Sequence, residues 1–187
     1  MQTRMRRNIL WITRTAVFIT LLVTVQGITA PLGNQFVTGA AGNLIMILSL
    51  LICGPATGLI VAGISPVCAM LVGFGPAFPP LVPFITLGNL VFIAAWFLLG
   101  LLNKSDNSEL RYKVISYIIA IMAAVMKFSA LYVGIVLFAV PYILNLNEKQ
   151  SAVLSLTFSY PQLITASIGG AIALAIVPSL KKALRIS

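Results

Sequence analysis

Residues 114–141 read VISYIIAIMAAVMKFSALYVGIVLFAVP, an apolar stretch in which Lys127 is the one charged residue. A membrane-spanning helix needs about 20 largely apolar residues, so this stretch is long enough to cross a bilayer. An ionisable side chain at membrane depth is costly and by default indicates a functional site. The stretch therefore predicts a membrane fold and, at Lys127, a binding site for a negatively charged partner.

The composition of the whole chain is that of an integral membrane protein. Hydrophobic residues make up 60% of the 187 residues and charged residues 8%, and the mean hydropathy is +1.08. Too few polar groups are present to cover a water-soluble surface. We expect a single all-α transmembrane domain, residues 1–187, with about six spans.

Hydropathy places six transmembrane helices at about residues 9–30, 38–53, 55–72, 83–102, 113–143 and 152–177. The basic N-terminus resembles a signal peptide, but Arg14 and Gln26 interrupt the apolar run and no small-residue cleavage site is clear. The first helix is therefore predicted to be retained. Small residues spaced four apart, such as Gly169 and Ala173, predict close packing between helices.

The distribution of basic residues orients this bundle in the membrane. With six spans, ten of them fall on one side, and Lys149 alone falls on the other; the ten are Arg4, Arg6, Arg7, Arg14, Lys104, Arg111, Lys113, Lys181, Lys182 and Arg185. The positive-inside rule then places both termini in the cytoplasm. The same distribution explains the net charge of +9 without a nucleic-acid partner.

Helical spacing predicts that Lys127 faces the interior of the bundle. Its neighbours at three, four and seven residues are mostly small, whereas the opposite side carries large apolar side chains; the first group is Ala120, Ala123, Ala124, Ala130, Leu131 and Gly134, and the second is Ile118, Val125, Phe128 and Val136. A small-residue face leaves room for a ligand beside the ammonium. The alternative is a structural lysine that bonds backbone carbonyls or snorkels outward.

Further polar and aromatic residues are candidates for the same site. They are the amides Asn43, Asn89, Gln35 and Gln162 and the aromatic residues Tyr132, Tyr160 and Phe78. A buried amide must find partners in the protein or on a ligand, although each could instead join two helices. The aromatic residues could be interfacial anchors. Phe78 lies in the proline-rich stretch 73–83, which is either a rigid connector or a lid.

Catalysis, metals and cofactors have no support in the sequence. The three carboxylates, Asp106, Glu109 and Glu148, lie in or beside predicted loops, and the chain contains no histidine. Neither paired acids nor a nucleophile triad can be formed. Cys53 and Cys68 lack metal-ligand spacing. We expect a protein that is not an enzyme and that carries no metal or cofactor.

Two stretches carry a family resemblance: QFVTGAAGNLIMILSLLICGPATGLIVAGISPVCAMLVGFGP (residues 35–76) and PFITLGN (residues 83–89). With its length, its predicted spans and its short second and third helices, the chain resembles the S component, the substrate-binding membrane subunit of energy-coupling factor (ECF) vitamin transporters. The resemblance covers nearly the whole chain. It implies a six-helix, multi-pass protein of the bacterial cytoplasmic membrane.

The resemblance also implies how such a subunit works. A vitamin binds near the extracellular face, under loops one, three and five, and is delivered when the subunit topples against a transmembrane coupling subunit that carries two ATPases. The family docks through small residues on its first helix, often Ala-xxx-Ala. The matching positions here are Ala16 and Thr20, so that threonine replaces the second alanine.

The substrate follows less directly from the residues. A buried lysine without an internal counter-ion favours a vitamin that bears a carboxylate, and pantothenate is a known substrate class of the family. Folate, biotin and niacin also carry carboxylates, while cobalamin would not need Lys127. Two rival functions are a membrane scaffold, in which Lys127 pairs with an acid on a partner helix, and a small membrane enzyme that uses Lys127 as a base.

Overall fold

The computed structural model describes residues 2–73, 75–103 and 109–184, and within these ranges it contains helices and no strands. Five helical segments are long and apolar enough to cross a membrane, and Pro55–Leu71 is a shorter apolar helix. The prediction of an all-helical fold is confirmed for these residues, and the long apolar helices fit a multi-pass membrane protein.

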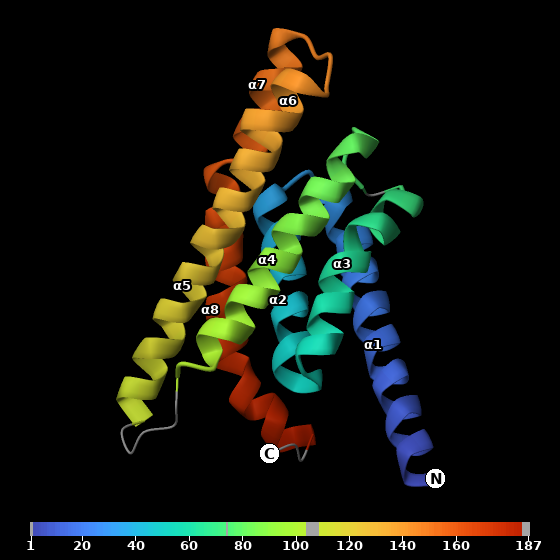
Figure 1. Cartoon of the computed structure of the whole chain (residues 1–187), viewed down its shortest axis with the longest axis vertical. Helices are drawn as coiled ribbons and strands as arrows, with labels where there is room; N and C mark the ends of the chain where they lie inside the picture. The colour runs from blue at the N-terminus through green and yellow to red at the C-terminus, as the bar shows by residue number, and fades with distance from the viewer. Residues whose placement is uncertain (1, 74, 104–108, 185–187) are drawn as a thin grey trace.

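The helices alternate in direction along the chain (Figure 1). In order they are α1 (Gln2–Thr29), η1 (Ala30–Leu32), α2 (Gln35–Cys53), α3 (Pro55–Leu71), η2 (Pro79–Leu81), α4 (Val82–Gly100), α5 (Glu109–Leu131), the π-helix η3 (Tyr132–Ala139), α6 (Val140–Tyr142), α7 (Glu148–Thr157) and α8 (Tyr160–Leu184). The start of α1 and the end of α8 lie at the same end of the molecule.

Local sequence explains how α2 and α3 are delimited. The side chain of Asn34 caps α2 by accepting hydrogen bonds from the backbone N–H groups of Phe36 and Val37, at 3.0 and 3.4 Å. Gly54 ends α2 with φ +94°, a conformation that favours glycine, and Pro55 opens α3 at a position where no N–H is needed. The predicted turn between two short helices is present.

The predicted helix 152–177 is in fact two helices, α7 and α8, and this part of the prediction was wrong. Pro161 has no backbone N–H with which to reach the carbonyl of Thr157, so the helical ladder stops there. Two glutamine side chains donate hydrogen bonds to the Thr157 carbonyl instead, from Nε2 of Gln35 at 2.7 Å and Nε2 of Gln162 at 3.3 Å.

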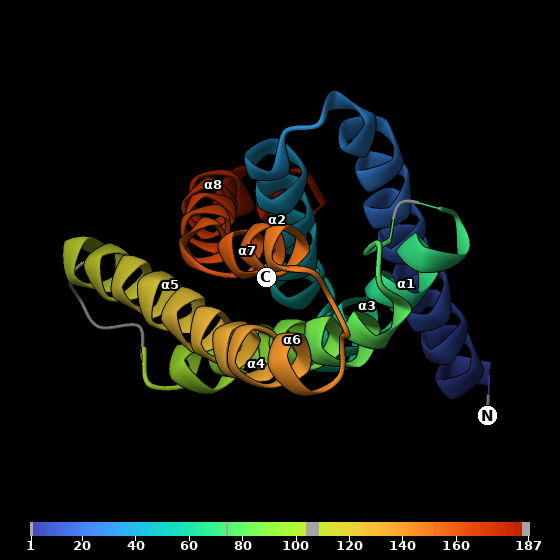
Figure 2. The same cartoon turned by 90° about the horizontal axis from the view of Figure 1, so that it is seen from above.

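The six longest helices form a ring, in the order α1, α2, α8, α5, α4 and α3. Seen from above, α1 stands at one side and α5 at the other, with α2 between them (Figure 2). The backbones of α2 and α8 approach closely, because a Cβ atom on Gly169 would lie 2.9 Å from the carbonyl oxygen of Ala40. The predicted close packing through small residues is confirmed at this contact.

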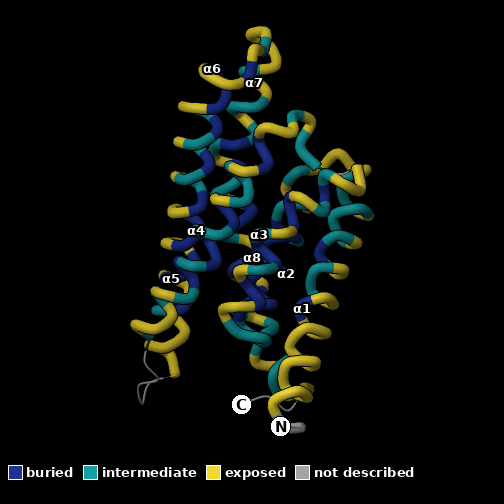
Figure 3. Tube along the Cα trace, turned by 45° about the vertical axis from the view of Figure 1, so that its right-hand side comes forward, coloured by how far each residue is buried: buried dark blue, intermediate teal, exposed yellow. Residues whose placement is uncertain are grey.

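Apolar side chains fill the bundle in two clusters. The larger contains Met46, Phe92 and Trp96, and the smaller contains Leu131 and Phe158 at the end of the bundle away from the start of α1. The outer faces are also apolar, as at Leu98, which is 58% exposed. Figure 3 shows buried residues along the middle of the bundle and exposed residues around it. Such an exposed apolar surface suits contact with lipid.

Candidate functional site: a polar cavity around Lys127

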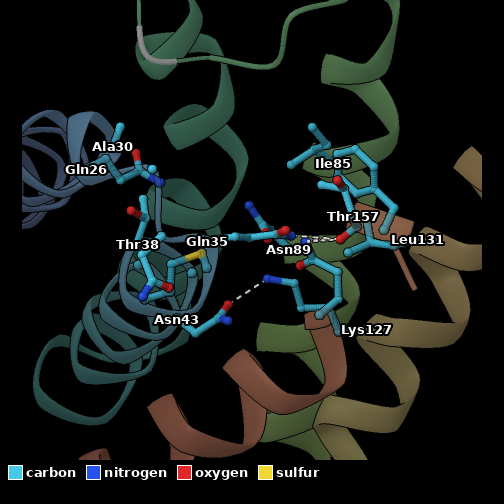
Figure 4. Close-up of a pocket in the computed structure, with 17 residues that line it drawn as sticks. Gln26, Ala30, Gln35, Thr38, Asn43, Ile85, Asn89, Lys127, Leu131 and Thr157 are labelled. Atoms are coloured by element: carbon cyan, nitrogen blue, oxygen red, sulfur yellow. Dashed lines mark hydrogen bonds between the residues drawn. The ribbon is translucent and has the colours of Figure 1, made fainter. Parts of the chain in front are cut away.

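A cavity of about 430 Å³ is lined by residues of both apolar clusters, such as Met46 and Leu131, together with polar side chains (Figure 4). Its volume lies within the range of small-molecule sites, roughly 300–1,000 Å³. The lining residues come from α1, α2, α4, α5, α7, α8 and the segments between them: Gln26, Ala30, Gly33, Asn34, Gln35, Thr38, Gly39, Gly42, Asn43, Met46, Ile85, Asn89, Lys127, Leu131, Thr157, Phe158 and Gln162.

Lys127 is the one charged residue among the described residues that line the cavity. It is 4% exposed. Its Nζ atom donates a hydrogen bond of 2.6 Å to Oδ1 of Asn43 and lies 5.1 Å from the centre of the Phe92 ring. No carboxylate of the described residues pairs with it; Glu109 instead pairs with Lys113 at 2.6 Å, at the exposed start of α5.

The packing of α4 against α5 places a second polar side chain close to Lys127. A Cβ atom on Gly88 would lie 2.5 Å from Cδ2 of Leu131, so glycine allows the two helices to approach closely one turn from Lys127. Asn89 follows Gly88 and also lines the cavity. Small residues at the contact therefore bring an amide of α4 and a cation of α5 to the same cavity.

Two amides in the cavity lack partners. Asn89 is 5% exposed, and its side chain forms no hydrogen bond with any described residue. Oε1 of Gln26 is buried and likewise unpartnered within the described part of the chain. An oxygen buried without a hydrogen bond, such as that of Gln26, costs roughly 1–3 kcal/mol. A ligand that bonds Gln26 would remove that cost and would find a further partner in Asn89.

Asn43 differs from these two because both ends of its amide form a hydrogen bond. It accepts the hydrogen bond from Lys127, and its Nδ2 atom donates to Oγ1 of Thr165 at 3.4 Å. Thr165 in turn donates to the backbone carbonyl of Gln162 at 3.2 Å. Asn43, Lys127 and Thr165 are all buried. The bonds join α2, α5 and α8 beneath the cavity.

Gln35 and Gln162 line the cavity at its α7 side. Both donate to the carbonyl of Thr157, which is the last residue of α7. Each amide nitrogen thus uses one of its two hydrogens, and the two side chains hold the end of α7 against the starts of α2 and α8. Phe158, which follows Thr157, closes this wall with an aromatic side chain.

The predicted aromatic residues do not line this cavity. Phe78 packs against the smaller apolar cluster, and the Tyr132 ring lies 5.6 Å from that of Phe128 on the same helix. Tyr160 is 54% exposed. The loop 73–83 contributes none of its described residues to the lining, and Phe74 lies outside the described residues.

Sequence reasoning also overlooked two residues of the site. Gln26 interrupts the apolar run of α1, which could have indicated a lining residue. Phe92 lies under the Lys127 ammonium but is one apolar residue among many in α4, so the sequence carries no signal for its role. Ala16 and Thr20 do not line the cavity, and both are exposed on α1.

The arrangement suits binding of an anion and offers no means of proton transfer by a carboxylate among the lining residues. Comparison with protein-family models, with curated proteins and with solved structures finds no match to this chain.

Proposed function

We propose that the chain is the substrate-binding S component of an ECF-type importer and that it captures a carboxylate-bearing vitamin, with pantothenate as the best candidate. The observation that carries the proposal is the buried Lys127 ammonium, which lines a cavity and, among the described residues, bonds a neutral oxygen and lies over a ring without an acidic partner. A carboxylate placed there would complete a charge-assisted pair with an ammonium that is itself buried.

The polar groups of the cavity favour one negative charge and several neutral polar groups on the ligand. Lys127 is the single cation of the described lining, which matches a monocarboxylate better than the two carboxylates of folate. Asn89 and Gln26 can each donate and accept, so they suit the amide and hydroxyl groups of pantothenate. Niacin and biotin share the single carboxylate, while cobalamin has no need of the cation.

In this proposal the captured vitamin is delivered across the bacterial cytoplasmic membrane. A transmembrane coupling subunit carrying two ATPases docks on α1, at the face that contains Ala16 and Thr20. The apolar outer surface of α1 supports this part, since Ile9, Ile12 and Val17 are each more than half exposed. The site binds and releases its vitamin without altering it, so the subunit itself is not an enzyme.

A membrane scaffold is the rival function. There, Lys127 would pair with an acidic residue on a partner helix. The position of Lys127 disfavours this, because the residue is buried among helices of its own chain and its Nζ atom bonds Asn43 inside the bundle.

Ligand binding by the chain alone tests the proposal. The protein is purified in detergent, examined by native mass spectrometry for a retained small molecule, and titrated calorimetrically with pantothenate, niacin, biotin, folate and cobalamin. We expect pantothenate to bind with a dissociation constant of about 1 μM or below. If none of the five binds and no small molecule is retained, the vitamin-capture proposal is wrong; retention of a membrane protein partner instead would favour the scaffold.

A further inference from the structure

We infer that Asn43 sets the charge selectivity of the Lys127 cavity and that Thr165 holds the Asn43 amide in the orientation that does so. The inference rests on the proposed function, because it explains why the cavity would prefer an anion. It starts from three hydrogen bonds in series: Lys127 to Asn43 at 2.6 Å, Asn43 to Thr165 at 3.4 Å, and Thr165 to the carbonyl of Gln162 at 3.2 Å.

The series fixes the direction of the Asn43 amide from both ends. Lys127 has only donors to offer, so it needs the oxygen of the amide. The Thr165 hydroxyl has one hydrogen, which it donates to the Gln162 carbonyl, so it can only accept from Asn43 and selects the amide nitrogen. If the amide were flipped, its NH₂ group would face the Lys127 ammonium, which is also a donor. Its oxygen would face the Thr165 hydroxyl oxygen, which is also an acceptor.

The backbone of Asn43 is held as firmly as its amide. A Cβ atom on Gly169 would lie 2.9 Å from Cβ of Asn43, so α8 packs directly against this residue. Asn43 is 2% exposed and Thr165 1% exposed, so both side chains are buried where they meet. The oxygen that faces Lys127 is thus placed by packing as well as by hydrogen bonds.

A neutral oxygen at this place positions the ammonium without cancelling its charge. Lys127 keeps further N–H groups for a ligand, and the cavity remains a site of net positive charge. Aspartate has nearly the same shape as asparagine, but at position 43 it would form an internal ion pair with Lys127. The side chain at position 43 therefore decides whether the cavity attracts an anion.

The test compares Asn43→Asp, Thr165→Val and Thr165→Ser with the unmodified protein, using pantothenate as the probe in calorimetric titration. We expect Asn43→Asp to weaken pantothenate binding at least about 30-fold, the scale of losing a desolvated charged pair. Thr165→Val should weaken it about 5-fold, as for one lost hydrogen bond, and Thr165→Ser, which keeps the hydroxyl, less than about 2-fold. Asn8→Asp, at an exposed position of α1, controls for the change in net charge.

A measurement without ligand separates this inference from the proposed function. Thermal unfolding is recorded for Asn43→Asp, Lys127→Met and the double variant. If position 43 governs the charge around Lys127, the double variant, which leaves a buried carboxylate unpaired, loses about 5 °C more than the sum of the single changes.

The outcomes are distinct. Pantothenate binding that is unchanged in Asn43→Asp overturns the inference and leaves the proposed function standing. If the unmodified protein binds no vitamin, the proposed function fails, and the unfolding data alone decide the inference: additive changes in melting temperature overturn it, and a large excess loss in the double variant supports it.

Discussion

At the scale of single residues, the site combines one cation with amides whose hydrogen bonding is incomplete. Lys127 bonds a neutral oxygen, and Asn89 and Gln26 keep unpartnered polar atoms within the described residues. Removing a charge from water without a counter-ion costs several kcal/mol. Burial of Lys127 therefore lowers the stability of the folded protein, and a bound anion would restore part of that stability.

Replacement of Lys127 by methionine separates binding from stability. We expect Lys127→Met to weaken pantothenate binding by about 2–4 kcal/mol, which is about 30-fold to 1,000-fold, because a desolvated charge pair is lost. The melting temperature of the ligand-free variant should not fall, since an uncompensated buried charge is removed. Calorimetric titration and thermal unfolding measure the two effects.

Lys113→Met is the matched control, because Lys113 is exposed at the start of α5 and pairs there with Glu109. It should leave the affinity within about 2-fold of the unmodified protein. Equal affinities for Lys127→Met and the unmodified protein would remove Lys127 from the binding site.

Much of the cavity lining was predictable because polar residues stand out in apolar helices. Lys127, Asn43, Asn89 and Gln162 interrupt such stretches, and in the structure all four lie around one cavity with Gln35. The positions of Phe78, Tyr132 and Tyr160 were not predictable, since an aromatic side chain suits lipid, core and pocket equally. Their placement depends on how each helix is rotated.

At the scale of helices, glycine contacts decide how closely the elements approach. Gly169 of α8 packs against the backbone of α2, and Gly88 of α4 packs against Leu131. Hydropathy located most of the helices to within a few residues but joined α7 to α8. Apolarity continues through Pro161, whereas the backbone hydrogen bonds do not, and a hydropathy profile carries no information about those bonds.

The α2–α8 contact predicts the effect of a single methyl group. In Gly169→Ala the new Cβ atom would lie 2.9 Å from the Ala40 carbonyl oxygen and from the Leu44 nitrogen, so the helices must separate. Such overpacking costs about 1–3 kcal/mol, and we expect a fall in melting temperature of about 3–10 °C in detergent.

Gly100→Ala controls for the change in helix propensity, because a Cβ atom on Gly100 meets nothing within 4 Å. It should leave the melting temperature unchanged or slightly higher. A Gly169→Ala protein as stable as Gly100→Ala would show that the contact between α2 and α8 is loose.

At the scale of the whole molecule, the alternating helices place the start of α1 and the end of α8 together and α7 at the opposite end (Figure 1). The cavity lies toward the α7 end, since Thr157 and Gln162 line it. The basic residues predict that the shared end is cytoplasmic. In that orientation the cavity would open toward the cell exterior.

Cysteine labelling tests this orientation. In a background with Cys53 and Cys68 replaced by alanine, Lys149→Cys on α7 should react with a membrane-impermeant maleimide in intact cells. Lys182→Cys, near the end of α8, should react only after permeabilisation. The reverse pattern would show that the protein has the opposite orientation in the membrane, with the cavity on the cytoplasmic side.

Helix α1 buries little of its surface against the other helices, and this affects the bundle as a whole. Only 11% of the residues in its most apolar stretch are buried, and it packs mainly on α2 and α3. Yet Gln26 of α1 and Lys127 of α5 line the same cavity from different walls. A ligand that bonds both residues would tie α1 to the rest of the bundle. The ligand-free and ligand-bound proteins would then differ in how far α1 can move away from the other helices.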